Sequence, residues 1–184
     1  SSSKDREQQD TLAARGYWQA FQKVKESVYL VLQNKNPGGV AENDYGAWYR
    51  ELFGPSVAAG IIKPADLAGY RNDRVFIRNS MHIPMAPRDV PDSMDVFFEL
   101  LTEETDPAVR VVLGHFIFVY IHPYMDGNGR MGRFLMNLML AAGGYPWTVI
   151  PVEYRNGYMA ALEQASVHEN IAPFSRFLGE LVEA

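Results

Sequence analysis

The chain has 184 residues, of which 47% are hydrophobic and 21% charged, and its formal net charge is −5. This composition is typical of a globular protein rather than a disordered or low-complexity one, and the length favours one compact domain. The acidic balance argues against an extended nucleic-acid surface, although a helix N-terminus and a few arginines can still hold a small anion. Because the chain has no cysteine, disulfides, thiolate nucleophiles and cysteine zinc sites are excluded.

No apolar run reaches the roughly 18 to 20 residues that a membrane span needs, and the polar start has no secretory core. We therefore expect neither a membrane nor a nucleic acid as partner. A cytoplasmic location is expected, with delivery of a secreted effector into a host cytosol as the alternative. The first residue is Ser1 rather than Met, which indicates a trimmed chain or a fragment.

The first third of the chain predicts two helices. Apolar residues recur at helical spacing over 8–33, and the Asn-Pro-Gly-Gly segment at 36–39 ends that pattern. A second, shorter helix is predicted over 44–53. We interpret residues 1–60 as an N-terminal helical segment that packs on a core formed by residues 61–184, the two together making one compact domain.

The remaining chain predicts a small flap followed by helices. Residues 75–84 contain two short β-prone pieces around a polar turn, which predicts an exposed β-hairpin. Asp106-Pro107 predicts a helix start, and residues 109–121 are apolar nearly all round, which is typical of a helix at the centre of a bundle. That helix is expected to end before Pro123. Further helices are predicted over about 129–142, 152–165 and 173–182.

Residues 122–133, HPYMDGNGRMGR, carry most of the chemical information. Gly127 and Gly129 flank Asn128, and glycines can adopt backbone conformations that let successive N–H groups converge on one point. This arrangement predicts an anion nest. The nest opens into the helix predicted to begin near Gly129, whose N-terminus also favours a phosphate.

The charged residues of this segment extend the prediction. Arg130 and Arg133 are three residues apart on one helix face, where both can bind phosphate oxygens with charge-assisted hydrogen bonds. The single carboxylate, Asp126, suits Mg²⁺ shared with a nucleotide. His122 can take a proton from an attacking hydroxyl near neutral pH. These residues predict phosphoryl or nucleotidyl transfer, and which phosphorus is attacked stays open.

The segment resembles the signature of the Fic family, HPFxDGNGRxGR, with Tyr124 in place of the usual phenylalanine. The resemblance covers about residues 67–181 and implies an all-α, Fic-type helical bundle with a short β-hairpin flap. Fic proteins typically transfer AMP from ATP to a Ser, Thr or Tyr hydroxyl of another protein. The resemblance therefore implies a protein adenylyltransferase (AMPylation) that uses ATP and Mg²⁺ and acts on a protein target.

The resemblance also implies roles for particular residues. His122 would be the general base and Asp126 the Mg²⁺ ligand, and Tyr124 a core anchor. The implied nucleotide- and phosphate-binding residues are Gly127, Asn128, Gly129, Arg130, Gly132 and Arg133, with Tyr158 and Ser166 lining the nucleobase pocket. Within that set, Asn128 and the amides of Gly127 and Gly129 would form the anion hole, Arg130 would hold the terminal phosphate and Arg133 the inner ones. The flap residues Ile77, Arg78, Asn79 and Ser80 would bind the target segment by strand addition.

Regulation is where the chain departs from the family. Many Fic proteins have an inhibitory pattern [S/T]xxxE[G/N], and no good copy is present here. Inhibition by a separate antitoxin-like chain, inhibition by trimmed sequence and no inhibition all stay open, as does a homodimer. The alternative functions are a Fic-fold kinase or phosphocholine transferase, and a nucleotide-binding regulatory module without catalysis. Retention of Gly129 favours AMP transfer over kinase chemistry.

Several other residues have simpler interpretations. His115, on an apolar helix, is predicted to be a core histidine bonded to a nearby carbonyl. For His82 in the flap, a solvated side chain and a substrate contact stay open. Trp18, Trp48 and Trp147 are predicted to be core anchors.

Overall fold

The computed structural model describes residues 2–184. Within them the chain forms α1 (Ser3–Leu32), α2 (Pro37–Ala58), η1 (Pro64–Leu67), η2 (Pro87–Asp89), α3 (Val90–Glu103), α4 (Pro107–Ile121), α5 (Asn128–Ala142), η3 (Val152–Tyr154), α6 (Arg155–His168) and α7 (Ala172–Glu183). The described residues contain no β-strand. The all-α prediction is therefore confirmed.

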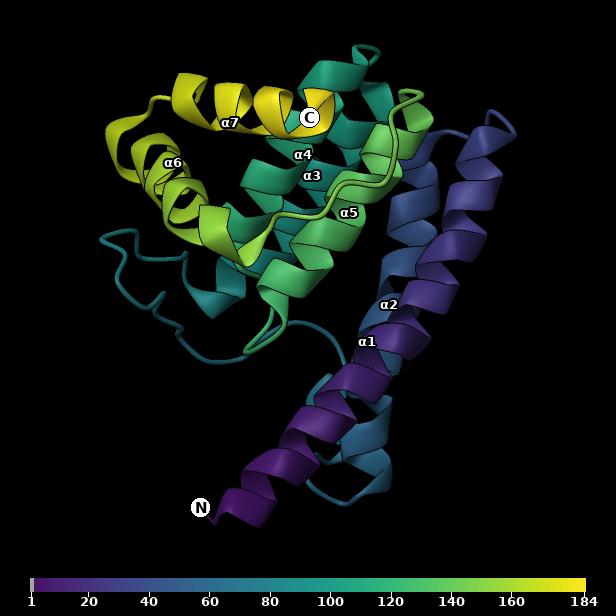
Figure 1. The fold of residues 1–184 in the computed structure, drawn as a ribbon, viewed down its shortest axis with the longest axis vertical. Coiled ribbons are helices and arrows are strands. Elements are labelled where there is room, and N and C mark those ends of the chain that lie inside the picture. The colour runs from purple at the N-terminus through teal and green to yellow at the C-terminus, as the bar shows by residue number, and fades with distance from the viewer. Residues whose placement is uncertain (1) are drawn as a thin grey trace.

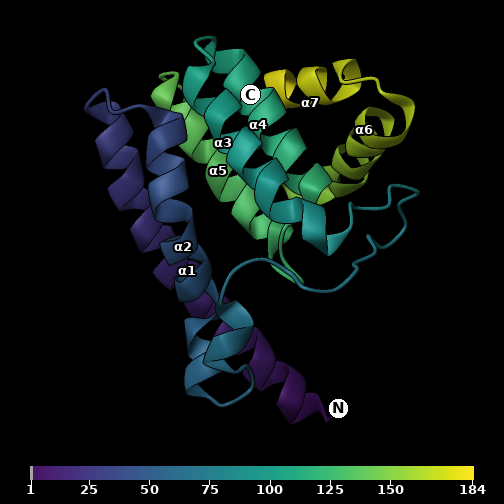
Figure 2. The ribbon, with the colours of Figure 1, turned by 180° about the vertical axis from the view of Figure 1, so that it is seen from behind.

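α1 and α2 form a long antiparallel pair, and one end of the pair projects beyond the other helices (Figure 1, Figure 2). The turn between them both ends α1 and starts α2. The Asn36 side chain accepts a hydrogen bond from the Gly39 N–H at 3.1 Å, and Pro37 is the first helical residue. The prediction that the second helix begins near residue 44 is wrong, because this cap outweighs the two glycines. One of them, Gly38, is needed for space: a Cβ there would lie 2.4 Å from the backbone nitrogen of Thr102.

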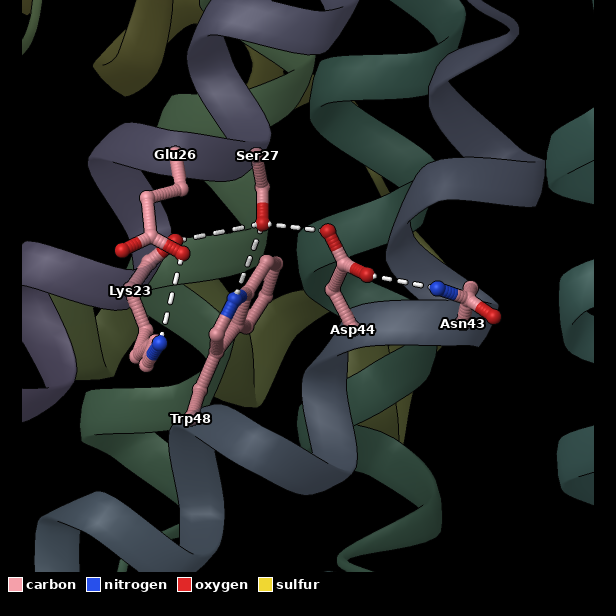
Figure 3. A network of polar contacts seen from close by, with 6 residues as sticks. All are labelled: Lys23, Glu26, Ser27, Asn43, Asp44 and Trp48. Carbon is pink, nitrogen blue, oxygen red and sulfur yellow. Dashed lines mark hydrogen bonds and ion pairs between the residues drawn. The ribbon is translucent and has the colours of Figure 1, made fainter.

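A buried polar network joins α1 to α2 (Figure 3). The Ser27 hydroxyl donates to the Asp44 carboxylate at 2.6 Å and accepts from the Trp48 indole N–H at 3.1 Å. Ser27 and Trp48 are each about 1% exposed. Trp48 is the core anchor that was predicted, whereas the same prediction for Trp18 is wrong, since that side chain is 62% exposed.

The most buried helix is α5, and it packs against α1, α2 and α4. All residues from 131 to 140 are buried except Arg133, which is partly exposed. The 109–121 helix, α4, was expected at the centre of the bundle, and it packs against α3, α5, α6 and α7. Part of its surface stays open and lines an apolar groove with α3.

The predicted β-hairpin over 75–84 is also wrong. The segment is extended on either side of a turn at Arg78 and Asn79, with the Ser80 N–H donating to the Ile77 carbonyl at 3.1 Å. Its polar groups bond α6 and α4 instead of forming a ladder, since arms this short gain little from pairing with each other. We keep the name flap for residues 75–84. Figure 2 shows the connection from α2 to α3, which includes the flap, running beside α5 and α6.

The boundaries of α4, α5 and α7 follow the predictions closely, whereas α1 begins at Ser3 instead of near residue 8 and α6 spans Arg155–His168 instead of 152–165. Asp106 caps α4 by accepting hydrogen bonds from two backbone amides, at 2.8 and 3.3 Å, and α4 ends directly before His122. Among the described residues, no helix combines the length and the hydropathy that a bilayer crossing requires.

Candidate active site

A cavity of about 650 Å³ lies between the flap, the α4–α5 junction and α6. The predicted site residues that line it are Ile77, Arg78, Asn79, Ser80, His122, Gly129, Arg133, Tyr158 and Ser166. The predicted site residues that do not line it are Asp126, Gly127, Asn128, Arg130 and Gly132. The structure thus brings together the general-base candidate, one of the two motif arginines, the start of α5, the flap and the predicted nucleobase pocket.

His122 ends α4 in the left-handed conformation, with φ 54° and ψ 62°. Its Nδ1 lies 3.1 Å from the Val119 carbonyl oxygen, which can only accept, so Nδ1 carries the proton. Nε2 is therefore left as a proton acceptor. Burial lowers the pKa of His122, and the charge of Arg71 adds to this; the bond to Val119 and the charge of Asp126 oppose it, but the net direction is downward. The imidazole is consequently neutral at pH 7, as a general base must be.

The loop between α4 and α5 is held from inside by Asn128. Its amide group donates to the Tyr124 carbonyl at 2.7 Å and accepts from the Tyr124 N–H at 2.9 Å. Gly127 takes a positive φ of 85°, and a Cβ there would lie 2.9 Å from the Phe53 ring. The Gly127 N–H already donates to the Asp126 carboxylate at 2.7 Å. Asn128 therefore braces the loop, which leaves the first amides of α5 as the groups free for an anion.

The two arginines diverge. Arg133 lines the cavity, and Gly129 leaves room for it, because a Cβ at Gly129 would lie 3.2 Å from its Nη1. Arg130 instead pairs with Asp126 at 3.5 Å and lies over the Phe53 ring, 5.3 Å from its centroid. The shared helix face does not bring both side chains into the cavity, because Asp126 and Phe53 hold Arg130 outside it.

Gly132 belongs to the contact between α4 and α5. A Cβ there would lie 2.9 Å from Val119 and 3.3 Å from His115. The Gly132 carbonyl accepts from His115 Nδ1 at 2.8 Å, which confirms His115 as a core histidine bonded to a carbonyl. Its Nε2 then accepts from the Tyr158 hydroxyl at 2.6 Å. Burial raises the pKa of Tyr158 to about 12, although the charge of Arg133 opposes this shift.

The flap is attached to α6 by one carboxylate. Glu163 accepts from the Ser80 hydroxyl at 2.5 Å and from the Met81 N–H at 2.7 Å. Burial raises the pKa of Glu163, but these two bonds and the neighbouring histidines together lower it by more, so the pKa lies below its ordinary value. On the α4 side, His82 Nε2 donates to the Tyr120 carbonyl at 2.9 Å. His82 is therefore bonded within the fold, and only 9% exposed, instead of solvated.

Some residues of the cavity were not among the sequence predictions, notably Arg155, Met159 and Glu163 on α6. A signal for them exists. Tyr158 and Ser166 are eight residues apart, and residues 155, 159, 162 and 163 fall on the same helix face by the three-to-four-residue period. The amphipathic period of α6 could thus have extended the predicted pocket.

Residues 122–133 offer a divalent cation one carboxylate, that of Asp126. Asp126 is exposed beside the start of α5, with 78% of its side-chain surface accessible. No cluster of three or more His, Cys, Asp or Glu side chains suited to a metal occurs in the described part of the chain. A single carboxylate fits Mg²⁺, which keeps several waters and shares its remaining positions with substrate phosphates.

Comparison with known proteins assigns the family. The model of the Fic/DOC family matches residues 40–140, more than half of the chain. A protein of Nematostella vectensis named protein adenylyltransferase Fic is 38% identical over 128 residues, which are 67% of this chain and 29% of that protein. The protein of the same name from Drosophila yakuba is 35% identical over 128 residues and is covered to 25%. The chain belongs to the Fic/DOC family, and it spans less than a third of these relatives' length.

Solved structures show the same fold. A fragment of Fic-1 from C. elegans superposes with a TM-score of 0.74 at 25% identity, covering 93% of this chain and 48% of that one. A Fic domain containing signaling protein from Bacteroides thetaiotaomicron superposes with a TM-score of 0.67 at 19% identity, covering 90% and 68%. The second likeness concerns the fold alone.

Proposed function

We propose that this chain carries a protein adenylyltransferase site, which moves AMP from ATP to a hydroxyl of a target protein. The observation that carries the proposal is His122, a neutral imidazole whose Nε2 is free and which lines one cavity with Arg133 and Gly129. A module that only binds a nucleotide has no need of a base at that place. The curated relatives named protein adenylyltransferase support the same activity.

The proposed reaction uses these groups in one displacement. The target hydroxyl oxygen attacks the α-phosphorus of ATP, and His122 Nε2 accepts the hydroxyl proton. The bond from the α-phosphorus to the bridging oxygen breaks, and pyrophosphate leaves with that electron pair. Arg133 and the first amides of α5, including that of Gly129, stabilise the negative charge that develops on the phosphates.

The metal ligand in this proposal is Asp126. A bound Mg²⁺ would supply positive charge that neutralises the phosphate oxygens. Asp126 now pairs with Arg130 at 3.5 Å, a distance typical of a weak ion pair, so the carboxylate can exchange that partner for the ion. Arg130 would then be released from Asp126 and free to bind the terminal phosphate.

The target segment would lie along the flap. Ile77, Arg78 and Asn79 line the cavity beside the base, and Phe76 is 76% exposed on the same segment. Strand addition to extended backbone does not need a pre-formed hairpin. The Met81 N–H is already bonded to Glu163, so pairing is proposed for the residues before it.

Two further partners are proposed: a separate inhibitory chain and a second copy of this chain. The missing inhibitory pattern is consistent with a separate antitoxin-like chain that would compete for Arg133, and a homodimer is compatible with the exposed aromatic residues of α1. Adding a candidate inhibitor to ATP-binding assays, and measuring mass by light scattering, would test these two points.

The activity is tested with ATP labelled at either the α- or the γ-phosphate, incubated with this protein and a cell lysate. We expect label in protein only from the α position, and none with His122→Ala. The matched control is His168→Ala, which removes a histidine outside the cavity. Label from the γ position would instead support a kinase, and labelled phosphocholine donors test that transfer. If no label depends on His122 while ATP still binds, the chain is a binding module.

A further inference from the structure

Arg71 is a buried cation that bonds the backbone around the general-base candidate. It is 5% exposed, and its Nε donates to the His122 carbonyl at 2.7 Å while Nη2 lies 3.4 Å from the Ile121 carbonyl. The backbone N–H of Arg71 donates to the Pro123 carbonyl at 2.9 Å. Three consecutive carbonyls at the end of α4 thus depend on one residue that lies about 50 positions earlier.

These carbonyls need partners. The last carbonyls of a helix have no intrahelical donor, and His122 adds a left-handed conformation that is unfavourable for a non-glycine residue. A guanidinium can satisfy several carbonyls because it presents five N–H groups in a fixed plane. Arg71 therefore stabilises the backbone conformation that presents the His122 imidazole to the cavity.

The same guanidinium also holds both ends of the flap. Nη1 donates to the Asp73 carbonyl at 3.1 Å, just before the flap, and Nη2 donates to the Met85 carbonyl at 2.6 Å, just after it. No ion pair of Arg71 with a carboxylate occurs among the described residues. All of its polar contacts are thus with backbone, so its geometry rather than its charge pairing matters.

We propose that Arg71 is a positioning residue that locks the two ends of the flap and the His122 turn into one unit. The inference deepens the proposed function, on which it rests: the segment that holds the target and the base that accepts its proton keep a fixed relation through one side chain. Arg71 lines no part of the cavity, so it contributes nothing directly to nucleotide binding.

The test compares Arg71→Lys and Arg71→Gln with the matched control Arg74→Lys, which alters an exposed arginine three residues away. Lysine keeps the charge but has donors at one point only, so it cannot reach carbonyls on both sides. We expect both Arg71 variants to lower the kcat for transfer of label from the α-phosphate of ATP to lysate protein by about 100-fold, because the reacting groups are then misplaced relative to each other. KM for ATP and the Kd of Mg²⁺-ATP should stay within about twofold of wild type, because Arg133 and the α5 amides are untouched.

A second measurement does not require activity, so it separates this inference from the proposed function. Amide hydrogen exchange should become faster over 73–85 and 119–126 together, and stay unchanged in α1, α2 and the second half of α5. Three results would overturn the assignment: full transfer by Arg71→Lys, faster exchange in only one of the two segments, or loss of the helical circular dichroism spectrum in both variants. The last would mean that Arg71 holds the whole fold rather than the site.

Discussion

At the scale of single residues, the tautomer of His122 determines what the site can do. The Val119 carbonyl holds the proton on Nδ1, and burial keeps the ring neutral by lowering its pKa. The acid limb of the rate profile should therefore lie below the ordinary histidine value of about 6.5. The kcat/KM for label transfer from the α-phosphate, measured at ATP well below KM from pH 5 to 8, checks this because it reports the free enzyme. A midpoint at or above 6.5 would contradict it.

His115 makes a prediction about stability and pH. Full burial lowers the pKa of His115 to about 4, whereas an unfolded histidine titrates near 6.5. Above pH 6.5 both states are neutral, and below it the unfolded state binds a proton first. The free energy of unfolding should therefore fall by up to about 3 kcal/mol as the pH drops from 6.5 to 4.

Urea unfolding at several pH values measures this dependence. His115→Gln should remove that part of the pH dependence, whereas His168→Gln, at an exposed histidine, should preserve it. Equal slopes in wild type and His115→Gln would show that another group is responsible.

Tyr158 bonds His115 and lines the cavity, so Tyr158→Phe should affect both stability and nucleotide binding. Loss of the hydroxyl leaves a buried imidazole nitrogen without its donor, at a cost of about 1 to 3 kcal/mol of stability. The hydroxyl is also a polar group on a residue that lines the cavity with Arg133, and we expect Mg²⁺-ATP to bind about tenfold more weakly without it. Calorimetric titration measures the affinity, with Tyr154→Phe as the exposed control. Unchanged affinity would mean that the Tyr158 hydroxyl takes no part in nucleotide binding.

At the scale of elements, the contact of α1 with α2 depends on Ser27. Its hydroxyl has one proton, which goes to Asp44, while it accepts from Trp48. Ser27→Ala removes both bonds and leaves the buried indole N–H unpaired, so the free energy of unfolding should fall by about 1 to 3 kcal/mol. Urea unfolding checks this, and Ser175→Ala, at an exposed serine, is the control. A loss no larger than in the control would show that water replaces the hydroxyl.

The elements also show how far local patterns predict structure. The ends of α4 and α5 were predicted to within about a residue, because caps, prolines and glycines act over one turn. The prediction missed the start of α2 because it took Gly38 as a helix breaker. Gly38 is instead part of α2, and its lack of a side chain lets the backbone of α3 approach closely. The flap forms no hairpin because its polar groups hydrogen-bond to α6 and α4, and its two halves do not pair with each other.

At the scale of the molecule, α1 and α2 share one hydrophobic core with the later helices. The Phe134 ring on α5 packs against two rings of the N-terminal pair: the ring centroids are 5.1 Å apart for Tyr17 on α1 and 6.5 Å apart for Trp48 on α2. We expect one cooperative unfolding transition, with helical circular dichroism and tryptophan fluorescence changing together. Phe134→Ala should lower the free energy of unfolding by about 3 to 5 kcal/mol, and both probes should report the same loss. Two separate transitions would show that residues 1–60 fold independently of the rest.

The sequence by itself determined most of the helices, the Asp106 cap of α4 and the chemistry of the loop at 122–133. Those features depend on neighbours within a turn or two, where spacing and residue type suffice. It placed His122 at the end of a helix, and Arg133 and Gly129 at the start of the next, so most of the candidate site followed from order along the chain.

Only the tertiary structure decided which side chains of that loop face the cavity. Asn128 turns inward, and Arg130 is drawn away by Asp126 and Phe53, although both residues match the motif as well as Arg133 does. The tertiary structure also showed that Arg71 bonds the carbonyls of His122 and Met85, which are 51 and 14 residues away. Every residue has a backbone carbonyl, so nothing in the residue types marks these acceptors, and only the fold brings them to one guanidinium.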